Sequence, residues 1–300
     1  MFSMNRLPTA KRAQILQMLC EGMSIRATSR LADVSVNTVS KLLVDAGALC
    51  RAFHDEMVRG VNAKRVQADE TWAFRGGMPR NETLGLPEQN AAVGDVWTHT
   101  AIDADSKLVI AYLVGARDGF CAELLIRDVE SRILADRTRL TTDQLNVYMR
   151  AVDLAFKGSV DYAMLHKAYE GASDGRHYLS ECEGTKRVVV AGDPDPKHIS
   201  TSCVEQADLT MRMHMRRFTL LTNVFSRKFE NHAHMVAIYT LWHNWVRIHR
   251  ALRVTPAMEA KLTDHVWSLP DIVEVMEAVN DRSQDHPETL PPQPLRYDLG

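Results

Sequence analysis

Apolar residues recur at helical spacing near the N-terminus, in residues 8–48, and the pattern is interrupted twice. Ser24 and Ser35 follow the two interruptions and are suitable N-caps, because a serine hydroxyl can accept a hydrogen bond from a free backbone N–H. The pattern therefore predicts three helices, with a tight turn at Asp33-Val34 between the second and the third. Two short helices, a tight turn and a third helix are typical of a helix-turn-helix.

The period changes from helix to strand after residue 65. Val66 to Phe74 predicts a strand, in which Asp69 points to the face opposite Val66 and Ala68. Residues 157–200 contain Gly, Asp and Pro throughout and predict irregular chain. The remaining pattern predicts strands at 96–103, 108–114 and 138–142, and helices at 119–134, 144–156, 201–222 and 231–249, with one more starting at Thr255-Pro256.

This order of elements predicts an α/β fold, with a mixed sheet flanked by helices, preceded by an all-α helix-turn-helix domain. We expect three parts: the helix-turn-helix and a linker in residues 1–65, the mixed sheet and its helices in 66–262, and a C-terminal helix with a proline-rich tail in 263–300.

Composition narrows the class of protein. Apolar residues make up 45% and charged residues 25% of the 300 residues, which excludes a disordered, collagenous or coiled-coil chain. No apolar run approaches the ~18 residues of a membrane span, and no secretory signal pattern opens the chain, so we expect a cytoplasmic protein without membrane contact. The five cysteines show no C-x-x-C spacing and predict free thiols. Four late histidines lack cysteine partners at zinc-ligand spacing and are expected on the surface, facing DNA: His232, His234, His243 and His249.

Charge is distributed unevenly, although the net charge is only -2. Residues 1–65 hold ten Lys or Arg against five Asp or Glu, and residues 205–261 hold nine against four. Two basic segments on either side of an acidic middle segment indicate a chain that binds a polyanion at two places. Uneven surface charge without a role is the competing interpretation.

The predicted third helix carries short hydrogen-bonding side chains on its outer face. In a helix-turn-helix, the first turns of that helix meet the base edges in the major groove. A three-helix bundle with a solvated polar face is the alternative. The residues expected to contact DNA are Asn37, Thr38, Ser40 and Lys41 on the third helix, and Arg26 and Arg30 on the second.

Three acids occupy places where a metal site could form. Asp69 lies in a predicted strand, Asp143 ends another, and Glu205 begins a helix. Transfer of a phosphodiester requires neutralised charge on the attacking and leaving oxygens, which two Mg²⁺ ions ~3.5–4 Å apart supply through carboxylate ligands. Each acid alone also fits a turn or helix cap. The neighbouring Glu70, Asp103 and Asp105 are expected to be such surface groups.

Basic residues follow Glu205 along the same predicted helix. Arg212 lies seven residues after Glu205, nearly two helical turns, and so shares its face. A cation there would contact a phosphate held by the metals, whereas a weak surface ion pair is the ordinary interpretation. Arg216 and Arg217 continue the basic patch and are expected to bind DNA phosphates.

Several segments together resemble insertion-sequence transposases of the IS-one type, a group of DDE transposases. The resemblance runs in order from about residue 9 to residue 275. Its clearest segments are V-Q-A-D-E-T-W-A-F, L-T-T-D-Q, and C-V-E-Q-A-D-L-T-M-R-M-H-M-R-R-F-T.

The resemblance implies a ribonuclease-H-like catalytic domain behind a DNA-binding region. Its metal-binding acids fall on Asp69, Asp143 and Glu205, and its basic residue falls on Arg212. Two departures stand out: no Cys-rich zinc finger precedes the helix-turn-helix, and Gln206 and Asp208 replace the family's common Arg and Asn. An extra acid one turn from Glu205 is expected to alter the charge balance of the metal site.

The implied reaction is cleavage at the element's ends, dependent on two Mg²⁺ ions that Mn²⁺ could replace, and then attack of the freed 3′-hydroxyl on target DNA. The implied partner is double-stranded DNA, and joining two ends implies a homo-oligomer. A catalytically inactive, transposase-derived DNA-binding regulator is the alternative, because the basic segments fit it equally well.

Overall fold

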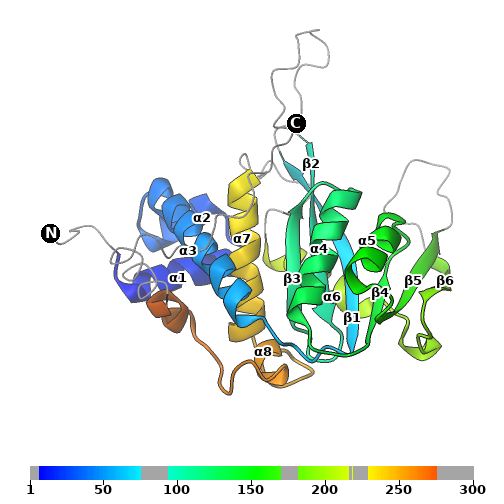
Figure 1. Cartoon of the computed structure of the whole chain (residues 1–300). Coiled ribbons are helices and arrows are strands. Elements are labelled where there is room, and N and C mark those ends of the chain that lie inside the picture. Colours follow the sequence, from blue (N-terminus) through cyan, green and yellow to red (C-terminus); the bar gives the residue numbers. More distant parts are fainter. Residues whose placement is uncertain (1–6, 76–93, 170–181, 216–217, 219–228, 276–300) are drawn as a thin grey trace, which may run out of the picture.

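The computed structural model describes residues 7–75, 94–169, 182–215, 218 and 229–275. Within them, a six-stranded mixed sheet is flanked by helices, and a group of N-terminal helices lies to one side (Figure 1). The fold class is therefore mixed α/β, as the sequence predicts. None of the helices in these segments combines the length and apolar character that crossing a membrane requires.

The three predicted N-terminal helices are present, and the second and third begin directly after their serine caps. They are α1 (Thr9–Cys20), α2 (Ile25–Ala32) and α3 (Val36–Met57). Ser24 Oγ accepts from the Ala27 N–H and Ser35 Oγ from the Thr38 N–H, at 3.1 and 3.0 Å. Asp33 ends α2 with a φ of 49°, a left-handed conformation that turns the chain into α3. Helix α3 continues without a break from the predicted third helix into the segment expected to be a charged, helical linker, and ends at Met57.

The sheet has the strand order β3-β2-β1-β4-β5-β6. β1 pairs antiparallel with β2 and parallel with β4, β4 pairs parallel with β5, and β5 pairs antiparallel with β6. The strands are β1 (Arg65–Arg75), β2 (Gly94–Asp103), β3 (Val109–Gly115), β4 (Thr138–Thr142), β5 (Val160–Tyr169) and β6 (Cys182–Ala191).

The prediction of irregular chain at 157–200 is wrong, because this region contains β5 and β6. β5 is an inner strand whose residues 162–165 are buried in succession, so it lacks the alternation of a one-sided strand. β6 is an edge strand, and its residues 184–187 are exposed. Neither strand therefore shows the period-2 pattern on which the sequence prediction relied.

Helices cover both faces of the sheet. α4 (Gly119–Arg132) packs on β2, β3 and α5 (Val147–Phe156), whereas α6 (Ser202–His214) contacts β1 and β2. Side chains of β1 show that these are opposite faces, since Gln67 bonds to the start of α6 while Glu70 faces Tyr148 of α5. The predicted helix at 201–222 is shorter than expected: α6 ends at His214, and residues 219–222 lie outside the described segments.

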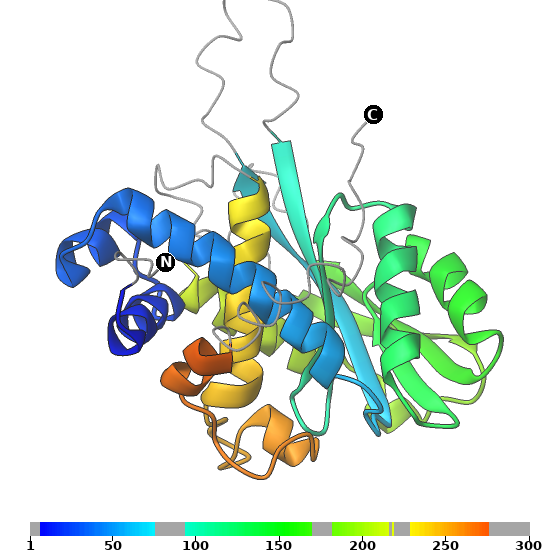
Figure 2. The ribbon, with the colours of Figure 1, turned by 60° about the vertical axis from the view of Figure 1, so that its left-hand side comes forward.

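Helix α7 (Phe229–Leu241) lies between the N-terminal helices and the sheet, and α3 crosses it (Figure 2). Gly47 marks the crossing, because a Cβ added there would lie 2.6 Å from the Cα of His234. The chain continues through a π-helical turn, Trp242–Val246, to α8 (Pro256–Glu259) and a last helix at 269–275. The core is continuous from α1 through the sheet to residue 273.

The π-helical turn positions Asn244 against the edge of the sheet. Its side-chain amide accepts from the Val109 N–H and donates to the Val109 carbonyl, both at 3.0 Å. His243 and His232 nearby are buried, at 5% and 3% exposure. The expectation that these two histidines lie on the surface is therefore wrong, because His232 contacts the Thr98 hydroxyl of β2 and His243 contacts the Lys107 carbonyl.

Candidate active site

The parallel register of β1 and β4 sets Asp69 beside Asp143. Ala68 of β1 pairs with Thr142, the last residue of β4, and the residue that follows each of them is one of the two acids. Ligand oxygens of Asp69, Asp143 and Glu70 all lie within 4.8 Å of one another. Two acids that are remote in the sequence thus lie side by side where β4 ends against β1. The hypothesis that Asp69, Asp143 and Glu205 form one metal site requires this.

Electrostatic repulsion acts on the Asp69 carboxylate. Its pKa is raised to about 6, first by burial and then by the charges of Asp143 and Glu205, against the hydrogen bond from the Glu70 N–H and the charge of Lys167. Asp69 is therefore the point where the charges of the three predicted acids meet. A cation bound there would relieve the repulsion.

Glu205 reaches this region from α6, on the face of the sheet that Asp69 also shares. One of its oxygens, Oε1, forms an ion pair with the Lys167 ammonium of β5 and accepts a hydrogen bond from the Thr201 hydroxyl. Its charge acts on Asp69. Among the described residues, however, Glu205 is outside the group of acids whose oxygens lie within 4.8 Å.

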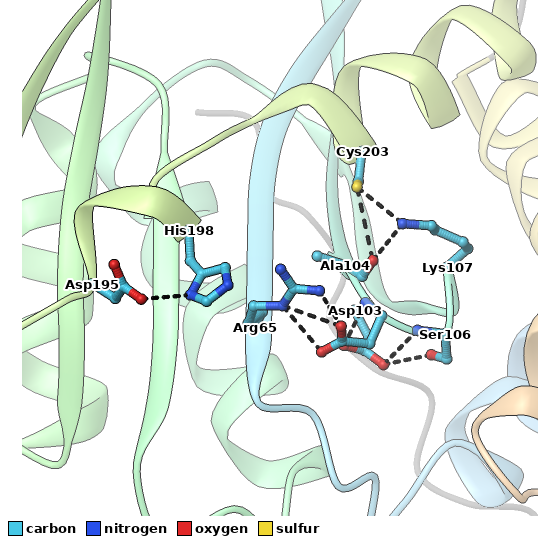
Figure 3. Close-up of polar contacts among 9 residues, drawn as sticks. Arg65, Asp103, Ala104, Ser106, Lys107, Asp195, His198 and Cys203 are labelled. Atoms are coloured by element: carbon cyan, nitrogen blue, oxygen red, sulfur yellow. Dashed lines mark hydrogen bonds and ion pairs between the residues drawn. The ribbon is translucent and has the colours of Figure 1, made fainter.

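Polar contacts hold the start of α6 on the sheet and so fix Glu205. Gln67 Oε1 accepts from the N–H groups of Cys203 and Val204, at 2.8 and 3.2 Å. Lys107, from the turn between β2 and β3, donates to the Cys203 sulfur at 3.1 Å (Figure 3). Asp103 in turn binds the backbone N–H and hydroxyl of Ser106, which shapes that turn (Figure 3). Buried Asp103 is thus a structural residue and not the surface group expected.

Glu70 is a site residue that the sequence interpretation missed. It was expected at the surface, yet its side chain is fully buried on the face towards α5. Burial, and then the charge of Asp143, raises its pKa to about 7. Its Oε1 is buried and lies 3.8 Å from His99 Nδ1, and a hydrogen bond with Tyr148 opposes the rise in pKa. One signal could have indicated a buried polar site here. His99 of β2 pairs with Glu70 of β1 and places a second polar group on the same face of the sheet.

Arg117, in the connection between β3 and α4, joins two of these acids. Its Nε donates to Glu70 Oε2 at 3.1 Å, and its Nη2 donates to Asp143 Oδ2 at 3.4 Å. The guanidinium also lies over the Trp97 ring, 4.6 Å from the ring centre. The sequence pattern gave no signal for Arg117, because only the folded strands bring it to these carboxylates.

Asp208 is the extra acid of α6, and it is buried at 2% exposure. Burial raises its pKa well above the usual range, and the charge of Asp69 adds to this, against contributions from Thr71 and Arg212. The neutral form of Asp208 is thereby favoured, which reduces its effect on the charge of the site. Arg212 itself is exposed on α6.

The residues predicted to contact DNA through the third helix lie on the N-terminal helices, away from the carboxylates. Arg26, Arg30, Asn37 and Lys41 are exposed, and Thr38 and Ser40 are partly buried. Lys41 is ion-paired to Asp45 one turn later. Arg216 and Arg217 lie outside the described residues.

Comparison with known proteins gives weak likenesses. No family model and no curated protein matches the chain. A solved Mos1 strand transfer complex is 13% identical over 54% of this chain, with a TM-score of 0.23, and the chain spans 60% of that protein. A pre-cleavage Mos1 transpososome is 11% identical, covering 93% of this chain and 81% of that one, with a TM-score of 0.26. A piggyBac transposase synaptic complex with hairpin DNA is 10% identical, covering 94% and 73%, with a TM-score of 0.34.

TM-scores of this size do not establish a shared fold. The donor set fits a divalent cation, because carboxylate oxygens of Asp69, Glu70 and Asp143 all lie within 4.8 Å of one another. Carboxylate oxygens are the hard ligands that Mg²⁺ and Mn²⁺ prefer.

Proposed function

We propose that this chain is a DDE transposase, with a ribonuclease-H-like catalytic domain and an N-terminal helix-turn-helix that binds DNA. The observation that carries the proposal is the meeting of Asp69 and Asp143 at the edge of β1 and β4, with the charge of Glu205 acting on Asp69. The ordered resemblance to transposases of the IS-one type supports it. So does the mixed sheet, whose central strands β1, β4 and β5 are parallel.

In this proposal, Asp69 and Asp143 would hold Mg²⁺ or Mn²⁺, and Glu205 would complete the site from α6. The bound cations would neutralise charge on the attacking and leaving oxygens of a phosphodiester. Asp69 would be the ligand shared by both cations, since the charges of Asp143 and Glu205 both act on it. The exposed Arg212 would hold the DNA backbone beside the site, by a charge-assisted contact to phosphate.

DNA binding is assigned to other parts of the molecule. Arg26 and Arg30 would meet the backbone, while Asn37 and its neighbours on α3 would face the base edges. Arg216 and Arg217, which lie outside the described residues, would bind DNA phosphates. Joining two DNA ends would require at least two copies of the chain.

The substitution Asp69→Asn tests the proposal. We expect Mg²⁺-dependent nicking of a labelled duplex, taken from the sequence flanking the reading frame, to fall at least about a hundredfold, because a charged ligand of the metal is lost. Binding of the same duplex should persist, since it is assigned to the N-terminal helices. Asp153→Asn, at an exposed carboxylate of α5, is the matched control and should nick normally.

Retained Mg²⁺-dependent nicking by Asp69→Asn would contradict the assignment. If the unaltered protein binds the duplex tightly but nicks it with neither Mg²⁺ nor Mn²⁺, the DNA-binding regulator is the correct function instead. A parallel reaction with chelator separates metal-dependent nicking from contaminating nuclease.

A further inference from the structure

Two basic side chains that the sequence did not single out contact the carboxylates from different elements. Arg117 comes from the connection before α4, and Lys167 comes from β5. Arg117 binds Asp143, and Lys167 binds Glu205. Two of the three proposed metal-binding acids are therefore held by a cation of the protein itself.

The contacts of Arg117 fix both its position and that of Asp143. The guanidinium is bonded to the buried Glu70 at 3.1 Å and lies over the Trp97 ring, so two contacts besides Asp143 restrain it. Its Nη2 then reaches Asp143 Oδ2 at 3.4 Å. Asp143 Oδ1 independently accepts from the Leu145 N–H at 3.0 Å. Each oxygen of Asp143 thus has a defined partner, which orients the carboxylate.

The contacts of Lys167 do the same for Glu205. The ammonium is paired with Glu205 Oε1, which the Thr201 hydroxyl also contacts. The Lys167 side chain is 26% exposed and the Glu205 side chain 36%, so the pair is only partly screened by water. The charge of Lys167 also reaches Asp69.

A cation that orients a ligand carboxylate also competes with a metal for it. The fixed geometry favours catalysis, because a ligand set held in place need not reorganise on binding. The positive charge opposes metal binding through Coulomb repulsion. Removing such a residue should therefore separate the two effects, with tighter metal binding and slower reaction.

We propose that Arg117 and Lys167 are positioning residues, which orient Asp143 and Glu205 and lower the affinity of the site for a divalent cation. The inference rests on the proposed function, because it takes these acids as metal ligands. It adds two residues that belong to no part of the predicted site.

The test is a calorimetric titration of the full chain with MnCl₂ and with MgCl₂, in parallel with nicking rates. Arg117→Met and Lys167→Met, which remove charge but keep a long side chain, should each bind the cation roughly three- to tenfold more tightly. At saturating metal, the nicking rate of both variants should fall by about tenfold or more. Arg117→Lys and Lys167→Arg keep the charge and should keep the cation affinity of the unaltered protein.

Arg137→Met is the matched control, because Arg137 forms a comparable ion pair with Asp161 elsewhere on the same sheet, at 2.8 Å. It should change neither the affinity nor the rate. Thermal unfolding of every variant verifies that the fold is intact. If a Met variant fails to fold, the charge-retaining variant at the same position tests the proposal instead. Its cation affinity must then equal that of the unaltered protein, and a different affinity contradicts the proposal.

Unchanged or weaker cation binding in both Met variants would overturn this inference while leaving the transposase proposal standing. The absence of cation binding and of nicking in the unaltered protein would instead overturn the proposed function. The two failures are therefore distinguishable in one set of titrations.

Discussion

Individual buried groups carry much of the pH sensitivity of this protein. His54, near the end of α3, is 2% exposed, bonds the Ile110 carbonyl at 3.0 Å and packs edge-on against Tyr112. Burial, with the charges of Arg132 and Arg59, lowers its pKa from 6.5 to about 3. Burial similarly lowers the pKa of His243 to about 4. Both side chains are therefore neutral in the folded chain at pH 5.

We predict that the free energy of unfolding falls as the pH drops below about 6.5. The unfolded chain then binds protons at His54 that the folded chain does not bind until about pH 3. The loss from His54 alone should reach about 2 kcal/mol at pH 5, since one pKa unit corresponds to about 1.4 kcal/mol. Denaturant unfolding of the protein and of His54→Gln at pH 7 and pH 5 measures it. An equal drop in both would contradict the assignment to His54.

The carboxylates show what single residues in a sequence can and cannot predict. Asp69 and Asp143 could be chosen because each lies in or directly after a recognisable strand, and parallel strands end at a common edge. Glu70 could not, since it follows Asp69 immediately and strand alternation places its side chain on the other face. Its oxygens still reach the group, because the Asp69 carboxylate turns back to bond the Glu70 N–H at 2.8 Å.

Helices and strands were predictable where the signal lay in their own residues, as a helix cap or as an alternation of apolar and polar side chains. The N-terminal helices, β1, the β2–β3 pair, α4 and β4 appear where the pattern places them. β5 and β6 were missed, because an inner strand and an edge strand are defined by their neighbours in the sheet and not by their own alternation. The contact of α3 with α7 was equally inaccessible, since 182 residues separate Gly47 from Phe229.

We predict that Gly47→Ala destabilises the protein by about 1–3 kcal/mol, despite the higher helix propensity of alanine. The added methyl group would collide with the backbone and Cβ of His234, so α3 and α7 must move apart. Gly184→Ala in β6, where an added Cβ meets nothing within 4 Å, is the control. The thermal unfolding midpoints of the two variants measure this effect. Equal midpoints would contradict a close contact between α3 and α7 at Gly47.

The N-terminal helices and the sheet are joined by a shared polar network as well as by the core. Arg132, at the end of α4 and 2% exposed, donates to the carbonyls of His54 and Val58, both at 3.2 Å. It also pairs with Asp128 at 2.8 Å and with Asp55. The end of α3 is thereby joined to the helix that covers the sheet by buried polar contacts.

We expect Arg132→Met to destabilise the whole chain by about 3 kcal/mol, because two carbonyls and two carboxylates lose a buried partner. Arg127→Met removes an exposed ion pair from the same helix and should cost less than about 1 kcal/mol. Denaturant unfolding should remain a single transition in the unaltered protein. A separate early transition for the N-terminal helices would show that the network does not couple them.

The side chain of Asn244 has a consequence for how copies of this chain can meet. By pairing with both backbone groups of Val109, it occupies hydrogen bonds that an incoming strand would need at the outer margin of β3. At the opposite margin, β6 exposes Val189 and Val190 beside the charged Lys186 and Arg187. The Asn244 amide therefore blocks the edge strand β3 at Val109, and charged side chains flank the exposed valines of the edge strand β6. Both features disfavour the addition of a strand from another copy and fibrillar aggregation.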